Sequence, residues 1–168
     1  NNDFKAEDFF SIPEPLIQKQ FSRIMSLKDG QKKMSKSDLS DLSRINLTDD
    51  KDQIINKIKK AKTDPMPMPA TIDELHKRPE AKNLIGIYSS LANLSLEKSL
   101  KEFSGKNFSE FKENLSQVLV DKIIPISLEI KKLLSEANYL DQILLEGCKK
   151  ADHIASKKIK KIHEIIGF

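Results

Sequence analysis

The sequence predicts a mainly α-helical protein with one short strand near its beginning. Glycine is scarce, at five residues in 168, while lysine, glutamate and leucine, which favour helices, are abundant. Apolar residues recur at helical spacing along most of the chain after residue 48. Residues 21–27 are the exception, because they are apolar enough for a buried strand.

Composition narrows the class of protein. Lysine and arginine together number 29 against 25 acidic residues, and this small excess permits contact with RNA without requiring it. The single cysteine, Cys148, excludes an internal disulfide and an all-cysteine metal site, and it falls on an apolar helical stripe, so we expect a buried structural thiol. No apolar run approaches the roughly 18 residues that a membrane span needs, so we expect no membrane partner and a soluble, cytoplasmic protein.

The first elements are an extended segment and a capped helix. Two prolines at alternate positions, Pro13 and Pro15, predict an extended segment. Asp49 or Asp50 can cap a helix with its apolar side formed by Ile54, Ile55, Ile58 and Ala61. That helix must end before residues 64–69, where three prolines at alternate positions predict a rigid connector; a proline-rich partner motif is the alternative.

The remaining helices follow from caps and helical spacing. Pro79 can begin a helix whose inward face carries Leu84, Ile87, Tyr88 and Leu91. Ser95 can cap a short helix that ends near Gly105. Ser109 opens a long apolar-periodic stretch that Pro125 should kink or divide. The last helix is expected from about Leu140 to Ile166, with Gly167 ending it.

The lysines and histidines outside these apolar stripes are expected to be solvent-exposed residues without a functional role. Two lysine clusters are expected to be solvated helix faces: Lys57, Lys59, Lys60 and Lys62, and Lys157, Lys158, Lys160 and Lys161. His76, His153 and His163 are expected at the surface or at helix ends, because their spacing does not suit a shared metal. The sequence therefore predicts no protein-bound metal.

Residues 32–38, with the sequence KKMSKSD, form the most informative segment. Lys33 and Lys36 can bring two ammonium groups to one polyphosphate, and Ser35 and Ser37 add hydroxyl groups that favour a turn. Positive charge aimed at departing oxygens lowers the barrier of a phosphoryl or nucleotidyl transfer. A solvated, lysine-rich loop is the alternative that charge by itself allows.

The order of these residues resembles the KMSKS signature of class I aminoacyl-tRNA synthetases, and the flanking sequence resembles the tryptophanyl branch. Three further blocks resemble that branch in order: residues 83–89 (NLIGIYS), the GKxFxxFK element at 105–112, and residues 140–151 of the last helix. The resemblance therefore covers nearly the whole chain. It implies the last strand and the KMSKS loop of a Rossmann-like catalytic domain in residues 1–48, followed by a helical domain in 49–168. Anticodon binding would fall at about 80–168.

The second signature of class I synthetases, of the His-Leu-Gly-His type, does not occur in this sequence. We therefore interpret the chain as the C-terminal portion of a longer enzyme. The tryptophan site and most of the ATP site would lie in the other half, so we expect the chain alone to be inactive.

The resemblance also implies roles for individual residues. Lys33 and Lys36 would be catalytic, holding the β- and γ-phosphates of ATP, with Ser35 and Ser37 adding hydrogen bonds. Ile24 and Met34 match positions at the adenine end of the ATP pocket; from the sequence alone, Ile24 is equally a core strand residue. One departure follows Asp38, since Leu39 and Ser40 replace a Pro-Asn pair that is common in the family.

As a whole, the resemblance implies a tryptophan–tRNA ligase that uses ATP with Mg²⁺, acts on tRNA-Trp and tryptophan, and is a homodimer. Two other classes stay open from the residues alone. One is a helical RNA-binding module without catalytic activity, and the other is a helical interaction protein whose lysine loop is incidental.

Overall fold

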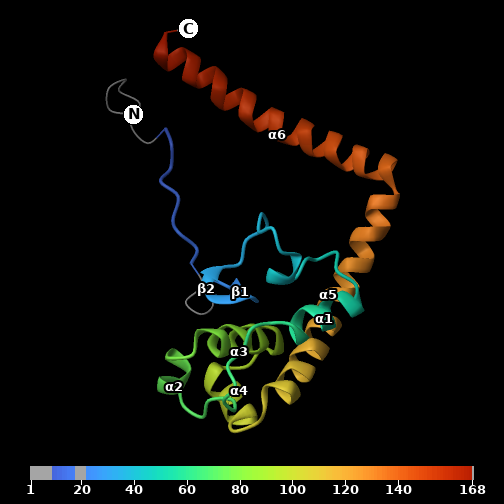
Figure 1. The fold of residues 1–168 in the computed structure, drawn as a ribbon. Helices are drawn as coiled ribbons and strands as arrows, with labels where there is room; N and C mark the ends of the chain where they lie inside the picture. Colours follow the sequence, from blue (N-terminus) through green and yellow to red (C-terminus); the bar gives the residue numbers. More distant parts are fainter. Residues whose placement is uncertain (1–8, 18–21, 168) are drawn as a thin grey trace. The chain divides into compact units, whose positions relative to one another are not determined.

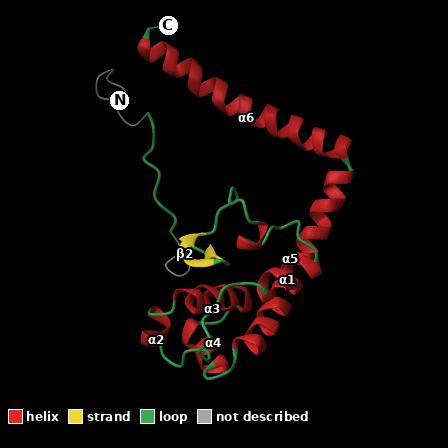
Figure 2. Cartoon of the chain, viewed as in Figure 1, coloured by secondary structure: helices red, strands yellow, loops and turns green. Residues whose placement is uncertain are grey.

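The structure is a computed structural model that describes residues 9–17 and 22–167. It divides into two compact units, one formed by residues 18–131 and the other by residues 1–17 with 132–168. The described part is mainly helical, as predicted, with its strands confined to a short hairpin (Figure 2).

The hairpin consists of β1 (Met25–Ser26) and β2 (Asp29–Lys33). The strands are antiparallel, with Met25 opposite Lys33 and Ser26 opposite Asp29, and with an irregularity between these pairs. The strand predicted over 21–27 is therefore wrong in extent: only residues 25–26 are strand, and Phe21 lies outside the described residues. Leu27 is buried where the chain turns, so the signature follows a second strand that the sequence did not predict.

A short 3₁₀ helix, η2 (Asp41–Ser43), comes after the signature, and α1 (Lys51–Lys59) follows it. Asp50 is the N-cap of α1 and forms a capping box with Gln53, which confirms the predicted start. Ile54, Ile58 and Ala61 are buried as expected, whereas Ile55 is 38% exposed.

Four further helices complete the larger unit: α2 (Ile72–His76), α3 (Pro79–Ala92), α4 (Leu96–Phe103) and the first part of α5 (Phe108–Ser135). Pro79 occupies the first turn of α3, and Ser95 accepts a hydrogen bond from the Lys98 amide, both as predicted. Figure 1 shows α3 beside the hairpin. Helix α2 was not predicted.

Helix α5 begins one residue before its predicted start. It begins at Phe108 rather than at Ser109, because the Asn107 side chain accepts a hydrogen bond from the Glu110 amide and so satisfies the first turn. Of the two outcomes predicted at Pro125, a kink or a division, the structure excludes the division, because α5 continues through Pro125 as one helix.

The core of the larger unit is formed by Leu27 and by the inner faces of α1 to α5. At its centre, Phe103 lies edge-on to both Tyr88 and Phe111, with ring centroids 4.9 Å apart in each pair. The proline-rich connector packs beside this core, since Met68 is only 2% exposed. Arg78 holds it, with Nε 2.8 Å from Asp64 Oδ2 and Nη1 2.6 Å from the Pro67 carbonyl oxygen.

The last helix, α6 (Ala137–Ile166), ends at Gly167 as predicted, with Gly167 at a φ of 85°. No residue of α6 is buried. Cys148 is exposed, so the predicted buried thiol is wrong: the stripe on which it lies is not covered in the described part of the chain. Lys157, Lys158, Lys160 and Lys161 are exposed, as are all three histidines, as expected. Along residues 9–17 and 22–167, no helix combines the length and apolarity that a bilayer crossing requires.

Candidate functional site

The KMSKS segment leaves the hairpin at Lys33, the last residue of β2. The Met34 amide donates a hydrogen bond to the Ile24 carbonyl oxygen at 3.0 Å, and the half-buried Met34 side chain packs against the core. The beginning of the segment is therefore fixed to the strand opposite.

Beyond Met34 the chain forms an exposed turn. The hydroxyl oxygens of Ser35 and Ser37 lie 3.0 Å apart, and the Ser37 amide donates to Ser35 Oγ at 3.3 Å. The Asp38 amide donates to the Ser35 carbonyl oxygen at 3.4 Å. Serine thus builds the turn, in line with its preference for local side chain to backbone bonds.

The predicted phosphate-binding residues are all accessible. Lys33, Ser35, Lys36 and Ser37 are exposed. Neither lysine takes part in the ion pairs found among the described residues, whereas the neighbouring Lys32 lies 3.9 Å from Asp29. The side chain of Ile24 is 44% exposed, so a core position for it is wrong. The backbone hydrogen bond between Met34 and Ile24 brings together the two residues predicted at the adenine end of the ATP pocket.

Two contacts from α3 position the hairpin, and sequence reasoning missed both. The side-chain amide of Asn83 pairs with the backbone of Met25 as a neighbouring strand would. Its Oδ1 accepts a hydrogen bond from the Met25 backbone N–H at 2.9 Å, and its Nδ2 donates one to the Met25 carbonyl oxygen at 2.8 Å. Gly30 lies so close to the start of α3 that a Cβ there would stand 2.6 Å from the backbone of Pro79 and Glu80. Asn83 begins a segment that resembles the family, whereas Gly30 lies in the spacer between two such segments and carried no signal.

An ion pair between Lys62 and Glu80 adds to the junction between the start of α3 and the chain after α1, with 2.8 Å between Nζ and Oε1. The hydrogen bond from Lys62 lowers the pKa of Glu80, and the hydrogen bond with Glu80 raises the pKa of Lys62. Both shifts favour the charged forms.

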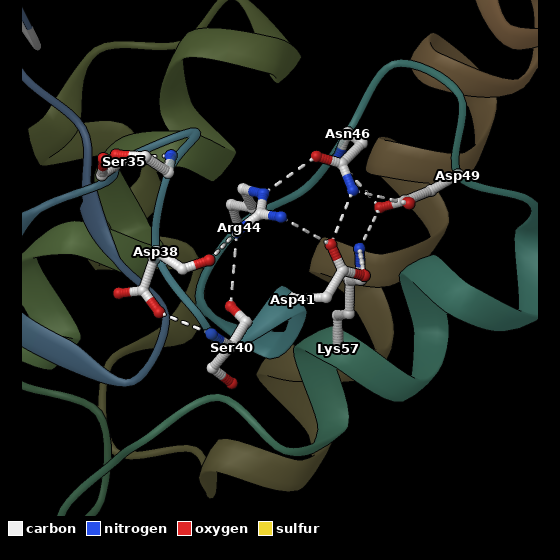
Figure 3. A network of polar contacts seen from close by, with 9 residues as sticks. Ser35, Asp38, Ser40, Asp41, Arg44, Asn46, Asp49 and Lys57 are labelled. Carbon is white, nitrogen blue, oxygen red and sulfur yellow. Dashed lines mark hydrogen bonds and ion pairs between the residues drawn. The ribbon is translucent and has the colours of Figure 1, made fainter.

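The exit of the signature is fixed by a network of polar side chains, drawn in Figure 3. Asp38 Oδ1 accepts from the Ser40 amide at 2.8 Å, and Arg44 Nη1 donates to the Asp38 carbonyl oxygen at 2.9 Å. Behind Arg44, Lys57 Nζ lies 2.6 Å from Asp41 Oδ2 and 2.6 Å from Asp49 Oδ2. The hydrogen bond from Lys57 leads the contacts that lower the pKa of Asp41.

Lys57 corrects one of the sequence predictions. It was expected on a solvated lysine face, but its side chain is only 3% exposed. A buried ammonium needs paired carboxylates, and Asp41 and Asp49 supply them. Of the acidic pair at the start of α1, Asp50 caps the helix while Asp49 serves this network.

The GKxFxxFK element has a structural use that the sequence did not reveal. Phe111 is fully buried in the aromatic centre, and Lys112 Nζ donates to the carbonyl oxygens of Lys59 at 3.2 Å and Ala61 at 2.7 Å. Lys112 thereby satisfies carbonyls at the C-terminal end of α1. Burial lowers the pKa of Lys112. Within residues 9–17 and 22–167, no three His, Cys, Asp or Glu side chains form a group that could hold a metal ion.

Comparisons with known proteins identify the family. The family described as "tRNA synthetases class I (W and Y)" matches residues 1–122. A tryptophan–tRNA ligase of Caulobacter vibrioides is 46% identical over 168 residues, which are 100% of this chain and 49% of that protein. A tryptophan–tRNA ligase of Mesorhizobium japonicum is 50% identical over 95% of this chain and 45% of its own length.

Solved structures share the fold. The tryptophanyl-tRNA synthetase of Mycoplasma pneumoniae superposes with a TM-score of 0.77 at 24% identity, over 97% of this chain and 49% of that one. The tryptophanyl-tRNA synthetase of Campylobacter jejuni gives a TM-score of 0.63 at 23% identity, over 99% of this chain and 50% of that one.

The chain thus spans about half the length of the curated relatives that it matches. The family match covers residues 1–122, well over half of the chain, and includes the signature loop and both of its anchors. The chain therefore belongs to the family of class I tRNA synthetases that comprises the W and Y enzymes.

Proposed function

We propose that this chain is the C-terminal part of a tryptophan–tRNA ligase and supplies the phosphate-binding loop of its active site. Two relatives with this activity in their names align with 95% or more of the chain at 46% and 50% identity. The observation that carries the proposal is the pair of exposed lysines, Lys33 and Lys36, on a turn whose two ends are anchored.

In the proposed reaction, the carboxylate of tryptophan attacks the α-phosphorus of ATP and pyrophosphate departs, which leaves tryptophanyl-adenylate. Negative charge builds on the departing oxygens, and the ammonium groups of Lys33 and Lys36 would offset it. Ser35 and Ser37 contribute hydrogen-bond donors, and Ile24 and Met34 line the adenine end. The tryptophanyl group then passes from the adenylate to the 3′ end of tRNA-Trp, and AMP departs.

ATP would enter this reaction with Mg²⁺, which would add positive charge at its phosphates. Of the carboxylates that follow the turn, Asp38 accepts a hydrogen bond from the Ser40 amide and Asp41 pairs with Lys57.

The rest of the assignment follows the family. Residues 1–48 would complete a Rossmann-like catalytic domain and 49–168 would form the helical domain, with the anticodon read at about 80–168. The intact ligase would be a cytoplasmic homodimer. Exposed lysines on α6, among them Lys157 and Lys161, suit contacts with RNA phosphates.

Pyrophosphate exchange by the full-length ligase that contains this chain tests the proposal. Lys33→Ala and Lys36→Ala should each lower the exchange rate by roughly 10²–10³, the loss expected when one group that stabilises developing charge is removed. Lys101→Ala, which alters an exposed lysine of α4, is the matched control and should leave the rate unchanged.

Unchanged exchange in both signature variants would reject the catalytic role. A loss of tRNA affinity with intact exchange would favour the RNA-binding alternative instead, and salt dependence would identify it.

A further inference from the structure

Arg44 lies just beyond η2 and holds the exit of the signature turn. Its Nη1 donates to two carbonyl oxygens, that of Asp38 at 2.9 Å and that of Ser40 at 3.4 Å. The Arg44 side chain is 18% exposed; its bond to the Ser40 carbonyl oxygen is partly buried, and its bond to the Asp38 carbonyl oxygen is exposed. One guanidinium thereby fixes the backbone two residues after Lys36.

Arg44 is itself held by two neighbouring side chains. Its Nε donates to Asn46 Oδ1 at 3.1 Å, and its Nη2 lies 3.1 Å from Asp41 Oδ1. A planar fork of donors can meet several acceptors in one fixed orientation, which an ammonium cannot do. The orientation of the guanidinium is therefore determined by contacts outside the turn.

A second tier connects these partners to the body of the protein. Asn46 Nδ2 donates to Asp41 Oδ1 at 2.9 Å and to Asp49 Oδ1 at 3.2 Å. Both carboxylates also bind the buried ammonium of Lys57 on α1. Figure 3 shows the tiers side by side, with Arg44 between the turn and the Lys57 group.

Among the residues that the structure describes, the hydrogen bonds of residues 35–37 link them only to one another and to Asp38. Residues 35–37 are exposed and are linked by the Ser35–Ser37 bonds. Before the turn, Met34 is tied to Ile24; after it, Asp38 is tied to Arg44. The position of Lys36 therefore depends on how firmly these two flanks are held.

We propose that Arg44 is a positioning residue for Lys36, acting through the Asp38 carbonyl on the lysine that meets the departing phosphates. The proposal rests on the proposed function of the signature loop. A misplaced catalytic group loses much of its effect, because only an aligned charge stabilises the transition state. The loss then falls on kcat more than on KM for ATP.

The competing explanation is that Arg44 only stabilises the fold, and the chain contains a matched control for it. Arg78 is also a partly buried arginine that bonds one aspartate and two carbonyl oxygens, those of Met66 and Pro67. It holds the proline-rich connector rather than the signature turn. A comparison of the two arginines separates positioning from stability.

The experiment uses the full-length ligase with Arg44→Gln, Arg44→Lys and Arg78→Gln, and measures kcat and KM for ATP in pyrophosphate exchange together with Tm. We expect Arg44→Gln to lower kcat about 10- to 100-fold with a smaller change in KM, as for displaced positioning groups. Arg44→Lys should have a kcat between those of Arg44→Gln and the wild type, since lysine keeps the charge but lacks the planar guanidinium donors. Arg78→Gln should lower Tm while kcat stays at the wild-type value below the melting range.

Equal kcat in Arg44→Gln and Arg78→Gln would overturn the proposal, as would full activity in Arg44→Lys. If Arg44→Gln does not fold, the Arg44→Lys comparison decides by itself. Failure of the proposed function is a separate result: there, Lys33→Ala and Lys36→Ala leave exchange unchanged. If those two variants slow exchange and the Arg44 variants do not, only the positioning role is rejected.

Discussion

The side chain of Asn83 is a hydrogen-bond partner for the backbone of β1. Its amide satisfies both the N–H and the C=O of Met25, a residue 58 positions away, and Asn83 itself is 8% exposed. A backbone group left unpaired away from water costs about as much as a lost hydrogen bond. This single side chain therefore decides how firmly β1 is attached to α3.

Replacing Asn83 by alanine should remove both hydrogen bonds and leave two backbone groups without partners. We expect the free energy of unfolding to fall by about 2 kcal/mol, within the range for buried polar groups that lose their partner. Urea unfolding measures the change. Asn114→Ala is the control, since Asn114 makes one exposed bond to the Glu110 carbonyl oxygen and should shift stability by less than about 0.5 kcal/mol. Similar losses in the two variants would contradict this role.

Asp41 makes the network around Lys57 dependent on pH. The hydrogen bond from Lys57, followed by that from Asn46, lowers the pKa of Asp41 below its model-peptide value of 3.8. Because the folded protein binds this proton more weakly than the unfolded chain, the stabilisation is complete above that value. It is lost as the pH falls through the lowered pKa.

Asp41→Asn should therefore be less stable than the wild type at neutral pH. The difference should shrink as the pH drops below about 4, where the unfolded chain takes up this proton, and it should be smallest below the lowered pKa of folded Asp41. Urea unfolding midpoints at a series of pH values measure this convergence. A difference that is the same at every pH would show that the charge of Asp41 is not what stabilises the network.

The hairpin depends on a close approach to helix α3. Gly30 faces the backbone of Pro79 and Glu80 at the beginning of α3, and atoms of a helix backbone cannot move aside as the end of a side chain can. Contact between these two elements thus requires a residue without a Cβ.

Gly30→Ala should push β2 away from α3 and cost roughly 1–3 kcal/mol, the usual penalty of overpacking. Gly147→Ala in α6 is the matched control: nothing lies within 4 Å of an added Cβ there, so the helix should gain up to about 1 kcal/mol from the better helix former. Thermal unfolding distinguishes the two signs. If Gly30→Ala does not lower the unfolding temperature, the hairpin lies farther from α3 than in the structure.

The helices were predictable because their signals are local. Asp50, Pro79, Ser95 and Gly167 each act within one turn of the helix end they define, and all four were identified from the sequence. Strand β2 was missed because its residues, DGQKK, carry no alternation of apolar and polar side chains. Its pairing depends on contacts from α3, which no local pattern reports.

Individual burial was predictable only where a helix face meets the core. Lys57 was missed because its two carboxylate partners come from the 3₁₀ helix and from the residue before the α1 cap. The predicted burial of Cys148 was wrong for a different reason. Cys148 lies on an apolar stripe with helical spacing, but no part of the described chain covers that stripe. The signature lysines were predicted as phosphate-binding residues from their order, and that role stays a prediction. Arg44, which holds the turn, belongs to no pattern.

Considered as one molecule, the chain places the proposed chemistry at one edge of a helical body. The hairpin and α1 to α5 share a core within residues 18–131, so the turn belongs to the same compact unit that buries Phe103 and Phe111. The Leu39 and Ser40 departure from the family pattern is compensated here: Asp38 accepts from the Ser40 amide, and Arg44 bonds both flanking carbonyls. The exit of the turn does not depend on a proline.

The hydrogen bond of the Leu27 amide has a consequence for the length of the stretch that carries the signature. The Leu27 amide donates to the Ser43 carbonyl oxygen at 2.9 Å, so the stretch that carries the signature leaves and returns to one point and forms a closed ring of chain. The entropy of closing such a ring depends on the logarithm of its length, and doubling the length adds only about 0.6 kcal/mol. Extra residues in the solvent-facing part of the ring would therefore enlarge it at little thermodynamic cost. Folding stability by itself does not fix the length of this stretch, whereas the proposed placement of Lys33 and Lys36 would.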